Sequence, residues 1–154
     1  MKVSVTSRKK MESRLKEGAL SGVAVVSFYD PPTEGRVWES PIDYRGKCDR
    51  VIQIPLWDLD PAALSAKGLT VDTYFPEADA VAEFIYRAKE EGLSLLCQCE
   101  YGQSRSAGCA AAVLEHFARR GITVFADYRY YPNQLVYHKV KDALDRRRAL
   151  KGEL

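Results

Sequence analysis

The sequence contains no apolar run long enough to cross a bilayer, and its first residues, MKVSVTSRKKMESRLKEG, lack the apolar core of a signal peptide. We therefore expect neither a membrane nor a secreted protein, and we predict a cytoplasmic location. Repeats, linkers and low-complexity tracts are absent as well. With 154 residues, the chain is long enough to bury a sizeable core, and we predict one domain over residues 1–154.

A strong excess of charge of one sign is also missing. Lys and Arg total 23 and Asp and Glu total 21, which gives a formal net charge of +2. Nucleic acids and anionic membranes usually select a more basic surface, so we expect neither as a partner. The composition, 46% hydrophobic and 29% charged, is typical of a globular protein.

The four cysteines follow no disulfide framework, and free thiols are expected in the cytoplasm. The Cys97-x-Cys99 pair lacks the gap of two to four residues that is usual between zinc ligands, so we predict no metal. Cys97 and Cys109 are expected to be core residues, with a redox role beside Cys99 left open for either. We also expect no cofactor.

Apolar runs alternate with amphipathic segments along the chain. This alternation predicts an α/β fold with a central, largely parallel sheet flanked by helices. We expect residues 121–128 to form a last strand or an extended loop, and both histidines, His116 and His138, to lie at the surface. Core packing is expected for the aromatic cluster at 128–132. The predicted strands cover residues 3–5, 22–30, 50–58 and 93–99, and the predicted helices cover residues 8–17, 76–91 and 104–120. A last predicted helix follows Asn133 and carries Val136, Val140 and Leu144 at a spacing of four.

The stretch CEYGQSRSAG interrupts the boundary between a buried strand, LSLLCQC, and an alanine-rich helix. In such a connection, the loop N–H groups and those of the first helical turn converge on one point and can bind an anion. Gly102 gives the backbone the freedom that this turn needs. The predicted phosphate-binding residues are Glu100, Tyr101, Gly102, Gln103, Ser104 and Arg105.

Three side chains give this stretch its chemistry. Arg105 can bind two phosphate oxygens with its planar fork. Cys99 lies at the floor of the resulting positive field, which favours a thiolate near neutral pH and thus a nucleophile aimed at phosphorus. Ser106 can hydrogen-bond the sulfur and ease its departure in a later step.

The spacing of Cys99, five residues and Arg105-Ser106 resembles the signature loop of the protein tyrosine phosphatase superfamily. It is most similar to the compact dual-specificity-like branch, as a single-domain, bacterial-type member. IPLWD resembles the segment that carries this branch's general acid, which would be Asp58. YPNQL resembles the segment that opens the last helix and supports the signature loop, here through Asn133, which could equally be a simple helix N-cap. Together these similarities cover roughly residues 50–144.

The sequence departs from the family pattern at two points. Gln98 stands where the family usually has a histidine, so one expected partner of the thiolate is missing. The interval between Asp58 and Cys99 is long for a compact member, which leaves Asp60 as an alternative general acid.

The resemblance implies a phosphatase that forms a phosphocysteine intermediate. The expected substrate is a phosphorylated protein or a small phosphomonoester, and inorganic phosphate, sulfate or vanadate should bind in the loop. The loop carries no lysine and no second arginine, which disfavours highly anionic inositol phosphates. Two alternatives stay open, a phosphate-binding module without turnover and a rhodanese-like sulfurtransferase, although sulfurtransferase loops usually have fewer residues between cysteine and arginine.

Overall fold

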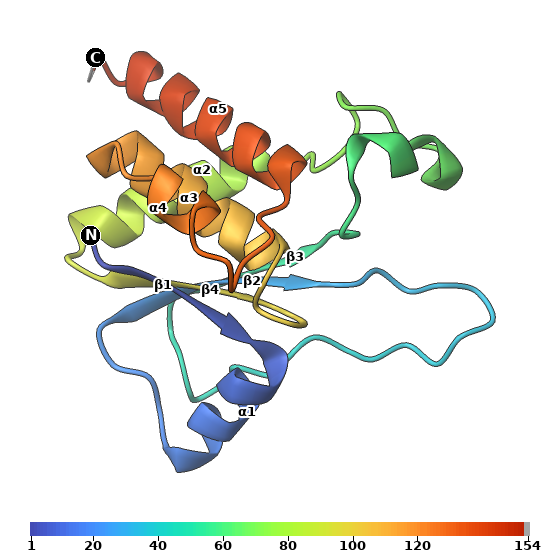
Figure 1. The fold of residues 1–154 in the computed structure, drawn as a ribbon. Coiled ribbons are helices and arrows are strands. Elements are labelled where there is room, and N and C mark those ends of the chain that lie inside the picture. The colour runs from blue at the N-terminus through green and yellow to red at the C-terminus, as the bar shows by residue number, and fades with distance from the viewer. Residues whose placement is uncertain (153–154) are drawn as a thin grey trace.

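A computed structural model describes residues 1–152, which form a four-stranded parallel sheet between two layers of helices (Figure 1). The strand order is β1-β4-β2-β3, and every neighbouring pair is parallel. This confirms the predicted α/β class with its central parallel sheet. The strands are β1 (Val3–Ser7), β2 (Val23–Tyr29), β3 (Val51–Pro55) and β4 (Ser94–Cys99).

The two central strands, β2 and β4, are buried almost throughout. Strands covered on both faces are expected to be continuously apolar, and VAVVSFY and SLLCQC fit that expectation apart from single polar residues. The polar exceptions, Ser27 and Gln98, are paired with each other across the β2–β4 boundary. All four strands run in the same direction, so their carboxyl ends meet at one edge of the sheet, where ligands of open α/β sheets usually bind.

The helices divide unequally between the two faces of the sheet (Figure 1). One face carries α1, whose Met11 and Leu15 pack with Val25 and Leu96 of the sheet and with Ile42 and Tyr44 of the segment between β2 and β3. The other face carries the larger core, beneath the remaining helices. The helices are α1 (Arg8–Glu17), α2 (Ala78–Glu90), α3 (Arg105–Ala118), α4 (Ile122–Phe125) and α5 (Gln134–Leu150), with 3-10 turns η1 (Pro61–Ala63) and η2 (Ser65–Lys67) between β3 and α2.

The small residues of α3 allow the start of α5 to approach it closely. A Cβ atom added at Gly108 would lie 2.5 Å from the carbonyl oxygen of Asn133, closer than side chains tolerate. Since Asn133 immediately precedes α5, this contact fixes the start of α5 beside the first turn of α3.

The prediction of a strand or an extended loop at residues 121–128 was wrong, because Ile122–Phe125 form the short helix α4. The β-branched residues there favour a strand, but the chain leaves α3 on the helical side of the sheet. Val124 packs against Ala107 and Ala111 of α3 instead of joining a strand. Tertiary packing thus overrides the local strand propensity.

His116 is not at the surface as predicted; its side chain is fully buried. Its Nε2 atom lies 2.5 Å from the hydroxyl of Tyr86, and its Nδ1 atom lies 2.7 Å from Oδ1 of Asp145. The sequence shows charged neighbours along the helix but not the partners that α2 and α5 supply. Both ring nitrogens therefore have a partner, which makes the burial of this polar ring tolerable.

Burial of His116 makes the stability of the fold sensitive to pH. It lowers the pKa of the imidazole, although the hydrogen bond with Asp145 acts in the opposite direction. In the unfolded chain this histidine has a pKa of about 6.5. Below that pH the unfolded chain therefore binds a proton that the folded chain, with its lower pKa, binds less readily. We expect the free energy of unfolding to fall as the pH decreases through this range, and His116→Gln should remove that part of the fall.

Urea denaturation at about pH 7.5 and about pH 5.5 would measure this difference, which spans the unfolded pKa of histidine. His138→Gln is the matched control, because His138 is exposed. An equal fall in the wild type and in His116→Gln would contradict the prediction. The lowered pKa of Asp145 contributes a separate loss of stability, at pH values below its ordinary pKa of 3.8.

Candidate active site

The signature loop, residues 99–105, connects the end of β4 to the first turn of α3. Its turn depends on Gly102, which has a φ of +68°. A Cβ atom there would lie 2.7 Å from the main-chain nitrogen of Ser7, so a side chain is excluded by contact as well as by conformation. The end of β1 thus supports the loop from one side.

The carbonyl groups of the loop are directed outward. The Glu100 oxygen accepts a hydrogen bond from the Arg8 N–H at 3.1 Å, the Gln103 oxygen from Tyr131 at 2.8 Å, and the Ser104 oxygen from Asn133 at 3.0 Å. In a trans peptide the N–H of the next residue points the opposite way. Within residues 1–152, no atom accepts a hydrogen bond from the N–H groups of residues 101–104.

Cys99 ends β4 and is only 2% exposed. Its Sγ atom lies 3.0 Å from the hydroxyl oxygen of Ser106, the fully buried second residue of α3. The structure therefore brings the predicted nucleophile and its predicted hydrogen-bond partner together at the base of the loop.

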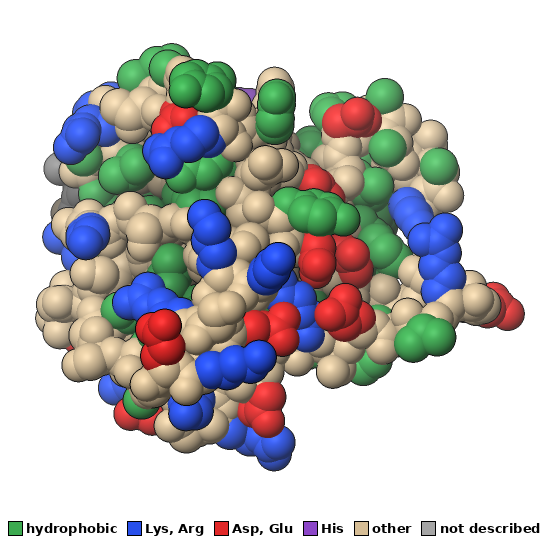
Figure 2. Space-filling view, turned by 60° about the horizontal axis from the view of Figure 1, so that its bottom comes forward, with side chains coloured by type: hydrophobic (Ala, Val, Ile, Leu, Met, Phe, Trp, Pro, Cys, Tyr) green, Lys and Arg blue, Asp and Glu red, His purple; other side chains and the backbone are tan. Residues whose placement is uncertain are grey.

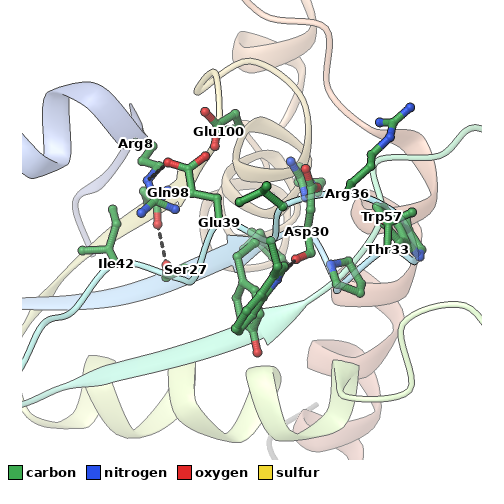
Figure 3. Close-up of a pocket in the computed structure, with 16 residues that line it drawn as sticks. Arg8, Ser27, Asp30, Thr33, Arg36, Glu39, Ile42, Trp57, Gln98 and Glu100 are labelled. Atoms are coloured by element: carbon green, nitrogen blue, oxygen red, sulfur yellow. Dashed lines mark hydrogen bonds and ion pairs between the residues drawn. The ribbon is translucent and has the colours of Figure 1, made fainter.

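The guanidinium of Arg105 is directed toward the carboxyl ends of β2 and β3. Its Nη1 atom donates to Oδ1 of Asp30 at 2.7 Å and to the carbonyl oxygen of Leu56 at 2.6 Å. The residue is 4% exposed, and its buried Nε atom has no hydrogen-bond partner among the described residues. Arg105 also lines a cavity of about 220 Å³, the Arg105 cavity, which is shown in Figure 3 with Asp30, Trp57 and Glu100.

The two candidate general acids lie in different environments. Oδ1 of Asp58 accepts hydrogen bonds from the Ser104 hydroxyl at 2.7 Å and from Nδ2 of Asn133 at 2.8 Å. Asp60 instead accepts a hydrogen bond from the N–H of Ala63 and caps η1. Asp58 therefore contacts the signature loop directly, whereas Asp60 is engaged in starting a 3-10 turn.

The sequence left two roles open for Asn133, a contact that supports the signature loop and a simple helix N-cap. In the structure it caps the helix and also contacts the segment around Asp58. Its Oδ1 atom accepts a hydrogen bond from Val136 and caps α5, while its Nδ2 atom donates to Asp58 and to the carbonyl oxygen of Leu59. One side chain thus links the start of α5 to residues 56–60, the Asp58 loop.

Tyr74 also holds the Asp58 loop, and sequence reasoning missed it. Its hydroxyl donates to the carbonyl oxygen of Trp57 at 2.6 Å. Burial and the nearby charge of Asp58 raise the pKa of Tyr74 to about 12, so the hydroxyl remains a donor under all ordinary conditions. The aromatic ring gave no signal in the sequence, because the segment from 61 to 77 carries no recognisable motif.

Gln98, which stands where the family usually has a histidine, contacts the main chain of Cys99. Its Nε2 atom donates to the carbonyl oxygen of Cys99 at 3.0 Å, and its Oε1 atom accepts hydrogen bonds from Tyr44 and Ser27. An amide therefore holds the main chain of Cys99 from the α1 side of the sheet. Burial raises the pKa of Tyr44 to about 12, so Tyr44 stays a donor to this amide.

The other cysteines lie outside this arrangement. All four are free thiols. Cys97 and Cys109 are both fully buried, and a hydrogen bond with Cys109, together with burial, raises the pKa of the Cys97 thiol well above its ordinary value. Within residues 1–152, no group of three or more His, Cys, Asp or Glu side chains is arranged to hold a metal ion.

The aromatic cluster at 128–132 does not pack in the core as predicted. Tyr128 and Tyr131 are 91% and 73% exposed, and only Tyr130 contacts a buried cluster. The segment connects α4 to α5, and its main chain also contacts the rest of the fold. The N–H of Tyr131 binds the signature loop, as described above.

No protein-family model and no curated protein sequence matches the chain. Solved structures match nearly all of it. Human DUSP28 has 18% identity and a TM-score of 0.52, with 96% of this chain and 94% of that chain covered. The PTP-2 phosphatase of Cydia pomonella has 14% identity and a TM-score of 0.55, with 92% and 85% covered. PTPMT1, solved in complex with PI(5)P, has 15% identity and a TM-score of 0.53, with 97% and 94% covered.

These similarities show that the chain has the fold of the dual-specificity and protein tyrosine phosphatases. The resemblance first suggested by the signature loop therefore extends over the whole fold.

Proposed function

We propose that this protein is a cysteine-dependent phosphatase that hydrolyses phosphomonoesters through a phosphocysteine intermediate. The observation that carries the proposal is the arrangement around Cys99. A buried thiol lies beneath a loop whose N–H groups are unpaired among the described residues, next to an arginine with a buried, unpaired Nε atom. An unpaired buried donor such as Nε of Arg105 is costly, and an oxyanion above Cys99 would satisfy it together with the loop N–H groups.

In the proposed first step, the Cys99 thiolate attacks phosphorus in line with the leaving oxygen. The S–P bond forms as the P–O bond breaks, and protonated Asp58 gives its proton to the leaving oxygen. The loop N–H groups and Arg105 hold the equatorial oxygens, on which transition-state charge is spread. These groups stabilise that charge without any step that requires a metal.

In the second step, water attacks the phosphocysteine and releases inorganic phosphate. The Asp58 carboxylate takes a proton from this water, while the S–P bond breaks and the thiolate of Cys99 is regenerated. The hydroxyl of Ser106, 3.0 Å from the sulfur, can donate a hydrogen bond to the thiolate as it leaves. Asp58 is therefore proposed to serve as acid and then as base.

The surroundings of the loop favour phosphotyrosine or phosphoserine and phosphothreonine on proteins over polyanionic substrates. Arg105 is the only cation of the loop, and Glu100 lies in the loop itself. Burial and the nearby Glu39 raise the pKa of Glu100, which indicates further negative charge at this edge. Figure 2 shows acidic and basic side chains intermixed on the face that carries α1, without a broad basic surface for nucleic acid or anionic lipid.

We propose a cytoplasmic location, where reducing conditions keep a catalytic thiol active. The free state of all four cysteines supports this. Within the described part of the chain, no helix is both long and apolar enough to span a bilayer.

If Asp58 is the general acid, its removal should reduce the rate of hydrolysis by an amount that depends on the leaving group. Asp58→Asn should slow hydrolysis of a phosphotyrosine peptide roughly a hundredfold, the usual range for acid catalysis, because the departing oxygen is basic. The rate of hydrolysis of an aryl phosphate with a more acidic leaving group should fall clearly less. Steady-state kinetics on both substrates would measure the two losses.

Asp60→Asn is the matched control, and it should show neither the large loss nor the leaving-group dependence. It removes the carboxylate that caps η1, so a modest loss of stability is expected instead. A leaving-group-dependent loss in Asp60→Asn alone would transfer the acid role to Asp60.

Hydrolysis of p-nitrophenyl phosphate by the purified protein tests the proposed function. We expect turnover that a metal chelator leaves unchanged and that orthovanadate abolishes. Turnover that needs added zinc or magnesium would contradict the mechanism. Transfer of sulfur from thiosulfate to cyanide without phosphate release would favour the sulfurtransferase, and phosphate binding without turnover would favour the binding module.

A further inference from the structure

A second cavity, of about 400 Å³, opens on the Asp58 side of the signature loop. It lies where the Asp58 loop meets the segment that leads into α5 (Figure 1). Asp58 itself and Ser104 of the signature loop line it, so the cavity is continuous with the candidate active site. We call it the Asp58 cavity.

The carboxyl group of Asp58 connects this cavity to the chemistry. Its two donors, the Ser104 hydroxyl and Nδ2 of Asn133, both reach Oδ1, and Oδ2 receives no hydrogen bond from residues 1–152. Under the proposed mechanism, Oδ2 is therefore the oxygen that can carry the acid proton to the leaving oxygen. Since the exposed Asp58 side chain lines the cavity, the part of the substrate attached to the leaving oxygen extends toward it.

Four apolar side chains stand around the cavity beyond Asp58. The Asp58 loop and η1 contribute Leu59 and Pro61, and the segment before α5 contributes Tyr131 and Pro132. The side chain of Tyr131 is exposed, but its N–H is fixed by a hydrogen bond of 2.8 Å to the carbonyl oxygen of Gln103. An aromatic residue is thus anchored by its main chain beside the signature loop. Exposed aromatic and apolar side chains gathered at a cavity are typical of a contact surface for another protein.

The two carboxyl groups at this cavity do not make it a site for a basic side chain. Asp58 carries the acid proton when the substrate binds and is then neutral. Asp60 is engaged in capping η1 through the N–H of Ala63. The apolar side chains are therefore the groups that remain for recognition.

We propose that the Asp58 cavity is a subsite for an apolar side chain of a phosphorylated protein, contributed by the residue next to the phosphorylated one. This inference rests on the proposed phosphatase function and narrows its substrate class. The volume of the cavity is in the range of sites that hold drug-sized ligands, which is more than a phosphate ester alone requires. A peptide continues past the leaving oxygen and can fill this space, whereas a small phosphomonoester cannot.

Matched phosphopeptides test this subsite. The reference peptide has glycine on both sides of phosphotyrosine. Two further peptides carry leucine before or after the phosphotyrosine, and two more carry lysine at these positions. Steady-state kinetics would be measured for each peptide and for p-nitrophenyl phosphate. If the phosphotyrosine peptides are not hydrolysed, the same comparison would be made with phosphoserine peptides.

For the wild type we expect kcat/KM to be about 10-fold higher on one leucine peptide than on the glycine peptide, as when a pocket selects an apolar group. Tyr131→Ala should remove most of this preference, and its loss should be larger on the leucine peptide than on p-nitrophenyl phosphate. Tyr131→Phe should keep the preference, because the ring is retained. Tyr128→Ala is the matched control and should behave as the wild type, since Tyr128 is exposed in the same segment but does not line the cavity.

Equal kcat/KM on the leucine and glycine peptides, a preference for lysine, or a leucine preference that survives in Tyr131→Ala would overturn the proposal. An equal loss on p-nitrophenyl phosphate would overturn it too, because it would place the aryl group itself in the cavity. Turnover of p-nitrophenyl phosphate without hydrolysis of any peptide would also contradict the subsite.

Absence of all turnover in the wild type would instead overturn the proposed function together with this inference, so the two failures are distinguishable. Thermal melting would verify that each variant is folded. If Tyr131→Ala does not fold, Tyr131→Gln takes its place, because it removes the ring but keeps a long side chain.

Discussion

Cys99→Ser should abolish phosphomonoester hydrolysis, with a loss of at least about 10⁴-fold, as expected when a nucleophile is removed from covalent catalysis. Serine is nearly the same size, so the buried site should keep its shape. Its hydroxyl ionises far less readily than a thiol and would attack phosphorus poorly. The measurement is the initial rate on p-nitrophenyl phosphate at saturating substrate.

The control for this substitution is Cys48→Ser. Cys48 is half-buried, and its sulfur lies 3.6 Å and 3.5 Å from the main-chain oxygens of Val23 and Arg50, which a serine hydroxyl can also bind. This variant should keep full activity. Cys99→Ser should still bind inorganic phosphate, because the N–H groups and Arg105 are unchanged. Substantial turnover by Cys99→Ser would remove Cys99 from its proposed role.

Arg105→Ala should reduce kcat/KM about 10³-fold, comparable to the loss of a principal donor to transition-state charge in other enzymes. Arg105→Lys should bind phosphate weakly and turn over poorly, because an ammonium offers a point charge in place of two parallel donors. Kinetics on p-nitrophenyl phosphate and binding of orthovanadate would measure both effects.

Arg36→Lys is the control for Arg105→Lys, since Arg36 is exposed and lines the same cavity. It should behave as the wild type. Thermal melting is needed alongside the kinetics, because loss of Arg105 leaves the carbonyl of Leu56 and the carboxylate of Asp30 without this donor. Near-normal turnover in Arg105→Lys would contradict the two-donor arrangement.

The central elements of the fold were predictable because local pattern and tertiary environment agree there. The buried runs that form β2 and β4 are apolar apart from single polar residues, and the glycine-bearing turn between β4 and α3 indicates the start of a helix. The short segment of α4 was not predictable, because its β-branched residues favour a strand and only packing against α3 decides otherwise. His116 was misassigned for the same reason, since its partners come from other helices.

The site was predictable where its residues are close in sequence. Cys99, Gly102, Arg105 and Ser106 lie within one short stretch, and their placement around one loop follows from its spacing. Asp30 was not predictable, because it is 75 residues from Arg105 in the chain and belongs to no motif. Gln98 illustrates a different limit. The absence of a histidine is visible in the sequence, but the amide contact with the Cys99 carbonyl requires the folded main chain.

Trapping the covalent intermediate tests the central claim most directly. The wild-type protein, mixed with p-nitrophenyl phosphate, quenched in acid within a turnover and digested, would be examined by mass spectrometry. We predict the mass of one phosphoryl group on the peptide that contains Cys99, lost when the quench is delayed until substrate is exhausted, and absent from Cys99→Ser. Continued turnover with no phosphorylated peptide, or with the phosphoryl group on another residue, would contradict Cys99 as the nucleophile.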